Sequence, residues 1–203
     1  MDKQGLVHAL KTCNSHHICR RVCFAPPRVI YIRQYQTLQR KRSSMAGMGS
    51  CQPEEKGSGS SSLNISTQKL GDLSIKKENI ITFKEGLFGF ENLKEFVIIN
   101  IEECRPFEWL VSVENPEITF PIINPVPFFT DYRPMDHIED LTELEIKDPK
   151  SVETFCIVTL GNKPENATVN LKGPILINTQ NKVGKQFVLL EDYYSLNHPL
   201  VKK

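Results

Sequence analysis

The chain has 203 residues, of which 39% are hydrophobic and 24% charged, and its formal net charge is +1. Its length suits one domain or two small ones, and it contains no run of about 18 apolar residues, which excludes an apolar membrane-spanning helix. The charge is divided unevenly. Residues 1–69 hold 11 basic and 3 acidic residues, a net of +8, whereas residues 70–203 hold 14 basic and 21 acidic residues, a net of −7. The acidic part is long enough to bury its own core, and it should repel nucleic acid and favour a basic partner.

The basic tail, residues 1–45, has Asp2 as its only acid and allows three interpretations. An arginine-rich, acid-poor start resembles an organellar transit peptide. The grouped side chains Cys13, His16, His17, Cys19 and Cys23 are of zinc-binding types, but they crowd one short segment and do not form two separated pairs. The third interpretation places the true start at Met45 or Met48. We expect this tail to be disordered or spurious.

Residues 46–69 are predicted to be a Gly/Ser-rich linker, and the folded domain is predicted to span residues 70–203. Only two of the six cysteines, Cys104 and Cys156, fall in that domain. This distribution does not indicate a disulfide framework and fits a reducing compartment. Cys156, in an apolar run, is expected to be buried, and Cys104, among charges, to be exposed.

Short apolar runs separated by turn residues predict strands in the first half of the domain. The predicted strands are Leu70–Ile75, Ile80–Phe83, Phe96–Ile101, Phe107–Val113 and Ile118–Asn124. Gly86 and Gly89 do not match a phosphate-binding loop, so we expect them to bend the chain and let Leu87, Phe88 and Phe90 pack on the sheet.

Alternation sorts the side chains of one of these strands. In Phe107–Val113 the odd-numbered residues should share one face, and Glu108, Leu110 and Ser112 the other. Pro121 indicates a sheet edge or a bulge, because proline has no N–H for the ladder.

The run from Asp131 to Ser151 is acidic and is the one plausible helical piece. Ile138, Leu141 and Leu144 are spaced for one or two turns lying on the barrel. The run lacks the calcium-loop pattern, so an acidic, solvated face that presents charge to a basic protein is favoured over a metal site. His137, and His198 further on, have no obvious companion and are interpreted as surface or capping residues.

The second half of the domain is predicted to end in a β-rich stretch, Ala167–Leu190, after a strand at Val152–Leu160. Its predicted strands are Thr168–Leu171, Ile175–Asn178 and Gln186–Leu190, with Gly184 near the end of a hairpin loop. About eight short strands with one short helical segment predict an all-β fold, a small and mostly antiparallel barrel or barrel-like sandwich.

The domain resembles the flagellar assembly factor FliW family over about residues 70–200. The matching stretches are Ile81-Thr82-Phe83, Gly86-Leu87, Gly89-Phe90, Pro106-Phe107, Ser112-Val113, Asp131-Tyr132 with Pro134, Val158-Thr159-Leu160, Thr168–Asn178, Gly184 with Gln186, and His198-Pro199-Leu200. The chain departs from the family pattern at Lys84 and Phe88, where proline is common, and at Val169, Lys172 and Gly173. The basic tail has no counterpart in that pattern.

The resemblance implies a cytoplasmic, monomeric β-barrel that is not an enzyme and needs no cofactor or metal. It implies two protein partners, the translational regulator CsrA, which such proteins antagonise, and flagellin, with no direct nucleic acid and no membrane. The acidic run suggests the residues that would contact a partner: Asp131, Tyr132, Asp136, Glu139 and Asp140. The alternative is a ligand-binding or enzymatic barrel with an acidic pocket near Asp131, which would need His137 and Cys104 to gather there.

Overall fold

The computed structural model describes residues 62–68, 70–161, 163 and 166–201. The predictions for the basic tail, and for the linker up to residue 61, lie outside these residues. The described chain forms β1 (Ser62–Thr67), β2 (Gly71–Lys76), β3 (Ile81–Phe83), β4 (Glu95–Asn100), β5 (Glu108–Ser112), β6 (Thr119–Ile123), β7 (Val152–Thr159), β8 (Thr168–Val169), β9 (Ile175–Asn178), β10 (Val183–Gln186) and β11 (His198–Pro199). Its helical parts are the short 3-10 turns η1 (Lys77–Asn79), η2 (Glu102–Cys104), η3 (Pro134–His137), η4 (Thr142–Leu144) and η5 (Pro149–Ser151).

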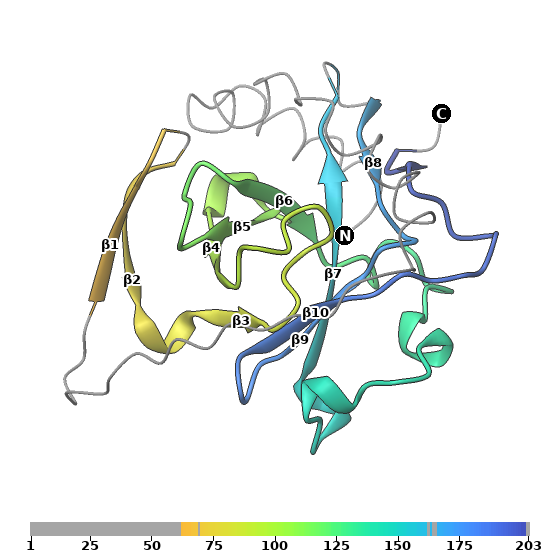
Figure 1. Ribbon diagram of the computed structural model, residues 1–203. Helices are drawn as coiled ribbons and strands as arrows, with labels where there is room; N and C mark the ends of the chain where they lie inside the picture. The colour runs from red at the N-terminus through yellow and green to blue at the C-terminus, as the bar shows by residue number, and fades with distance from the viewer. Residues whose placement is uncertain (1–61, 69, 162, 164–165, 202–203) are drawn as a thin grey trace.

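Seven strands close into a barrel in the order β7-β6-β5-β4-β3-β10-β9, and β9 returns to pair with β7 (Figure 1). All these pairings are antiparallel except that of β10 with β3, which is parallel. The prediction of an all-β, mostly antiparallel barrel is therefore confirmed. Within the described residues no helix is long and apolar enough to cross a membrane.

One face of every barrel strand points inward and forms the interior core. The fully or nearly buried members of this core are Ile81, Phe83, Leu87, Leu93, Phe96, Leu110, Phe120, Ile122, Phe155, Ile157, Ile175 and Ile177. Edge-to-face aromatic pairs help to fill it, with ring centroids 5.2 Å apart for Phe83–Phe96 and 5.1 Å apart for Phe90–Phe120. Burial of these side chains supplies the main favourable term in folding.

Two further clusters cover the outside of the barrel. The hairpin-side cluster lies under β1 and β2 and contains Ile65, Ile75, Val97, Cys104, Trp109 and Val111. The C-terminal cluster contains Phe107, Ile123, Tyr132, Cys156, Val158, Ala167, Val169, Leu171, Leu189, Tyr194 and Leu200. The predicted alternation is confirmed within β5, because Trp109 and Val111 face the hairpin while Leu110 faces the interior. Phe107, just before β5, instead packs in the C-terminal cluster and not with Trp109.

The turn between β3 and β4 also follows its prediction. Gly86 and Gly89 have φ angles of +73° and +84°, in the left-handed region that glycine tolerates. A Cβ on Gly86 would lie 2.7 Å from the Phe90 carbonyl oxygen. The bend places Leu87 in the interior core, with Phe90 packed against it.

The domain begins earlier than the boundary expected at residue 70. β1 lies inside the predicted linker, residues 46–69, and pairs along its whole length with β2. Leu63 and Ile65 alternate with polar residues, and Ile65 is buried against the barrel, which gives this stretch a reason to be ordered.

Three local predictions need correction. Cys104 is fully buried, because the η2 turn leaves its charged neighbours in solvent and directs its side chain into the hairpin-side cluster. It is also disulfide-bonded, so that Cys156 is the free thiol of the two described cysteines. Gly184 lies inside β10, where a Cβ would meet the Phe83 ring at 2.6 Å. Pro121 is in an interior strand, at a position of β6 that is paired with β5 but not with β7.

Candidate functional site

The acidic segment, residues 131–150, belongs to the long connection between the neighbouring strands β6 and β7. Long connections on a rigid scaffold often carry function, because their own backbone is not committed to a sheet. Its three 3-10 turns replace the predicted one or two helical turns. The segment is nevertheless fixed to the barrel at three points.

The first point is Tyr132, which is only 4% exposed and belongs to the C-terminal cluster. Its hydroxyl donates a hydrogen bond to the Leu171 carbonyl (2.8 Å) and lies 3.4 Å from Cys156 Sγ. Burial, and to a smaller extent the Cys156 thiol, raises the pKa of Tyr132, so the hydroxyl stays a donor. The aromatic ring also packs edge-to-face on Tyr194, with centroids 5.1 Å apart. Tyr132 therefore positions the segment from within the core.

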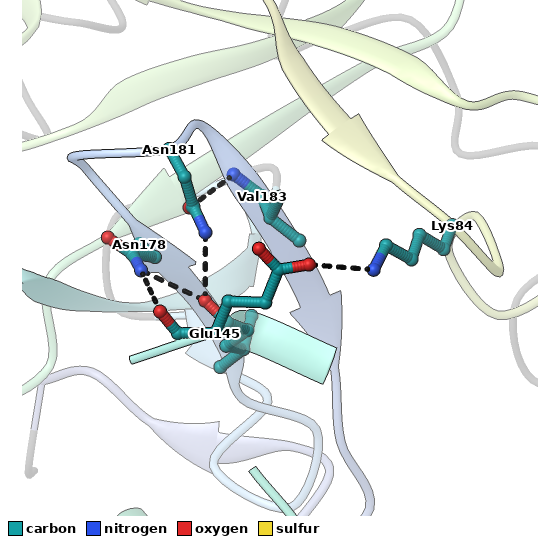
Figure 2. Close-up of polar contacts among 6 residues, drawn as sticks. Lys84, Glu145, Asn178, Asn181 and Val183 are labelled. Carbon is teal, nitrogen blue, oxygen red and sulfur yellow. Dashed lines mark hydrogen bonds and ion pairs between the residues drawn. The ribbon is translucent and has the colours of Figure 1, made fainter. Parts of the chain in front are cut away.

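The second point lies at the end of η4 and is shown in Figure 2. The Leu144 side chain is fully buried, and its carbonyl accepts hydrogen bonds from Asn178 Nδ2 (2.9 Å) and Asn181 Nδ2 (3.1 Å). Asn178 Nδ2 also lies 3.4 Å from the Glu145 carbonyl. The two amides thus hold the last turn of η4 against the β9–β10 hairpin.

Glu145 leaves this anchor in a left-handed conformation, with φ of 50° and ψ of 45°. This conformation is uncommon for a residue with a Cβ. Its carboxylate extends toward the turn that follows β3 and lies 3.3 Å from Lys84 Nζ (Figure 2). A second ion pair next to it joins Glu143 to Lys185 on β10 at 2.5 Å. Burial alone would lower the pKa of Lys185, but the Glu143 and Glu85 carboxylates raise it.

The third point lies where the segment enters β7. The Ser151 carbonyl accepts hydrogen bonds from Thr179 N (2.8 Å) and Thr179 Oγ1 (2.9 Å). Asp148 caps η5 by accepting a hydrogen bond from Lys150 N (3.0 Å). Thr179 follows β9 directly, so the β9–β10 hairpin supports the acidic segment at two of its three points.

The predicted partner-contacting residues separate into two groups. Asp131, Asp136, Glu139 and Asp140 are exposed, whereas Tyr132 is buried. The carboxylates of Asp131, Asp136 and Glu139 form no hydrogen bond or ion pair with any residue that the structure describes. The Asp140 carboxylate accepts hydrogen bonds from the Thr142 hydroxyl and N–H, and these bonds lower its pKa.

His137 has companions that the sequence did not reveal. Its Nδ1 lies 3.0 Å from Glu191 Oε1, and its Nε2 lies 3.1 Å from the Tyr193 hydroxyl. The ring also packs edge-to-face on Tyr194, with centroids 5.7 Å apart. His198 packs on Phe129 in a similar way, with centroids 5.1 Å apart. The acidic segment therefore lies beside the C-terminal residues 191–194.

The pocket that the alternative interpretation needs does not assemble. Cys104 belongs to the hairpin-side cluster, whereas His137 packs on Tyr194 of the C-terminal cluster. Across the described chain, no three histidine, cysteine or carboxylate side chains group as they would to hold a metal ion. The arrangement can present outward carboxylates on a fixed backbone, which is the chemistry of a binding surface.

Comparison with known proteins gives one consistent family. The family model described as FliW protein matches residues 64–200. The chain is 39% identical over 133 residues to the flagellar assembly factor FliW of Thermotoga sp. (strain RQ2), covering 65% of this chain and 89% of that protein. It is 41% identical over 136 residues to the protein of the same name from Caldicellulosiruptor bescii, covering 67% and 89%. A crystal structure of the flagellar assembly factor FliW superposes with a TM-score of 0.63 at 32% identity, covering 69% of this chain and 98% of that one.

Proposed function

This chain belongs to the FliW family of flagellar assembly factors, and we propose that it antagonises the translational regulator CsrA by direct protein contact. In this proposal the contact relieves repression of flagellin synthesis, and the chain also binds flagellin, so that unexported flagellin competes for it. The chain acts as a cytoplasmic monomer, without catalysis and without touching nucleic acid or membrane itself.

The observation that carries the proposal is the outward display of carboxylates by the acidic segment. Asp131, Asp136 and Glu139 are exposed and unpaired within the described chain, while Tyr132 and Leu144 are buried beneath them. A protein that holds RNA needs basic residues, and a fixed acidic surface attracts such a protein and orients its approach. The buried anchors reduce the conformational entropy that the segment would lose on binding.

Calorimetric titration of the full chain with CsrA of the same organism tests the proposal. We expect a complex at about 0.05 M salt that weakens strongly at about 0.5 M salt, because exposed charges are screened. Neutralising the unpaired carboxylates should weaken the complex by about tenfold or more. The variant carries Asp131→Asn, Asp136→Asn and Glu139→Gln.

A matched control neutralises three exposed carboxylates on the hairpin side of the barrel. It carries Asp72→Asn, Glu78→Gln and Glu103→Gln, and so changes the net charge equally. The control should bind CsrA nearly as well as the unaltered chain. Absence of a complex at low salt would refute the proposal, and equal weakening by both variants would refute the assignment to the acidic segment.

A further inference from the structure

The antiparallel ladder of the β9–β10 hairpin continues past the end of β10. Phe187 N donates to the Pro174 carbonyl (2.8 Å), and Leu189 N donates to the Lys172 carbonyl (2.9 Å). Both pairs keep the register of the hairpin, in which Gln186 opposes Ile175. Residues 187–190 therefore extend the hairpin's second strand.

The other side of this extension has no partner strand among the described residues. In an antiparallel strand, alternate residues direct N–H and C=O to opposite sides. Since Phe187 and Leu189 face residues 172–174, the backbone groups of Val188 and Leu190 point the opposite way. Neither N–H donates a hydrogen bond to any residue that the structure describes. Next to β10 that side is taken by β3, but the β3 pairing ends at Gly184.

The side chains follow the same alternation. Leu189 is buried in the C-terminal cluster, whereas Val188 is 40% exposed and Leu190 is 83% exposed. In Figure 1 the chain after β10, in blue, continues from the end of that strand toward the right-hand side of the molecule. Residues 187–190 form an open edge that combines free backbone groups with exposed aliphatic side chains, the features that strand pairing uses.

Acidic groups lie at the C-terminal end of the open edge. The Asp192 side chain is fully exposed, 3.8 Å from Lys172 Nζ. Glu191 contacts His137, which brings the exposed, unpaired Asp136 to the same end. The charge next to the edge therefore favours a cationic residue in whatever pairs with it.

We propose that the open edge receives an extended peptide segment of a partner protein by strand addition. The segment carries apolar side chains at alternate positions, which pack on Val188 and Leu190, and a lysine or arginine that lies near Asp192. Its backbone pairs with the outward N–H and C=O groups of these two residues. This surface adjoins Asp136 of the proposed CsrA contact. Strand addition uses the backbone of residues 187–190, however, and does not depend on that contact.

Amide hydrogen exchange of the ¹⁵N-labelled full chain tests the proposal. The probe is a synthetic peptide of alternating valine and threonine with lysine at both ends. Without peptide, the amides of Val188 and Leu190 should exchange fast and those of Phe187 and Leu189 slowly. With saturating peptide, exchange at Val188 and Leu190 should slow by about tenfold or more.

Two control peptides distinguish strand pairing from nonspecific binding. A peptide with the same side chains and alternate amides N-methylated cannot pair and should give no protection. A peptide with glutamate at both ends should bind more weakly than the lysine peptide at low salt. Equal binding by the N-methylated peptide would overturn the proposal.

A pair of variants at one position tests the backbone contribution. Leu190→Pro removes an N–H that the fold does not use, whereas Leu190→Thr keeps it and shortens the side chain. Loss of peptide protection at Val188 in L190P, with retention in L190T, supports strand addition. Slow exchange at Val188 and Leu190 without peptide would overturn it, showing that the chain itself, or a second copy if the protein is dimeric, covers the edge.

Discussion

The acidic segment and the β9–β10 hairpin differ in nearly every local property. The segment is charged, exposed and irregular, whereas the hairpin is a regular ladder whose first strand, Ile175–Asn178, is wholly buried. Yet the hairpin supplies the amides of Asn178 and Asn181 and the backbone of Thr179 that hold the segment. The exposed carboxylates of the acidic segment are therefore held in position by polar groups of the hairpin, the more regular of the two regions.

The largest effect should come from the buried amide that joins the two regions. Asn178 is 1% exposed, donates to the Leu144 carbonyl and accepts a hydrogen bond from Gln180 N (3.0 Å). Asn178→Ala removes these bonds in a buried site, so we expect a loss of about 2 kcal/mol in the free energy of unfolding. Urea denaturation measures this loss.

Asn181→Ala is the matched control, because Asn181 is exposed and donates to the same carbonyl. Its cost should be about 0.5 kcal/mol, since water can replace an exposed partner. Equal costs at the two positions would contradict the view that burial of Asn178 decides the strength of the anchor.

The second prediction concerns the anchor at Tyr132. It uses the pH dependence of stability that the neighbouring Cys156 thiol causes. Burial raises the pKa of Cys156 to about 12, from an ordinary value of 9.0. The Cys156 thiol therefore keeps its proton in the native state, whereas in the unfolded state it loses the proton above pH 9. The contribution of the neutral thiol to the free energy of unfolding is thus fully present below pH 9 and falls as the pH rises towards 12. Between pH 8 and pH 10 we expect a loss of about 1 kcal/mol in unfolding free energy.

Cys156→Ala should flatten this pH dependence, because alanine does not titrate. Tyrosines of the unfolded chain are about half ionised at pH 10, but they occur in both proteins, so the difference between the two slopes reports the thiol. Denaturation curves at several pH values, for both proteins, give the two slopes. Identical slopes would show that the thiol is not held neutral against Tyr132.

The sequence predicted the parts of this architecture that depend on local pattern. Alternation assigned Trp109, Leu110 and Val111 to the correct faces, although Phe107 packs in the C-terminal cluster, and Gly86 with Gly89 marked a real bend. Closure of the barrel by β7 with β9, and the parallel pairing of β3 with β10, join residues far apart in the chain and leave no local signal.

The candidate site was predictable to the same extent. The density of acidic residues located the segment, and solvation keeps carboxylates such as Asp136 on the surface. The sequence could not show that Tyr132 turns inward, nor that Glu191 meets His137, because both contacts depend on how distant elements pack. Asn178 belonged to the stretch that resembles the family, but its role in holding Leu144 required the structure.

The smallest expected effect on stability concerns a backbone feature that both regions contain. Each contains one non-glycine residue in the left-handed conformation, Glu145 with φ of 50° and Lys182 with φ of 57°. Glycine at such a position relieves about 1 kcal/mol of strain. Lys182→Gly should therefore stabilise the protein by about 1 kcal/mol, less a few tenths for the greater freedom of the unfolded chain.

Glu145→Gly should stabilise the protein less, because it also removes the ion pair with Lys84, whose side chain is about half exposed. An exposed pair contributes about 0.3 kcal/mol and is screened by salt. The gap between the two glycine variants should therefore close in urea denaturation at about 1 M salt. A difference between the two variants that persists at high salt would mean that glycine relieves no strain at residue 145, because contacts to the hairpin hold the Glu145 backbone. The acidic segment would then be tied to the β9–β10 hairpin more firmly than the hydrogen bond lengths alone imply.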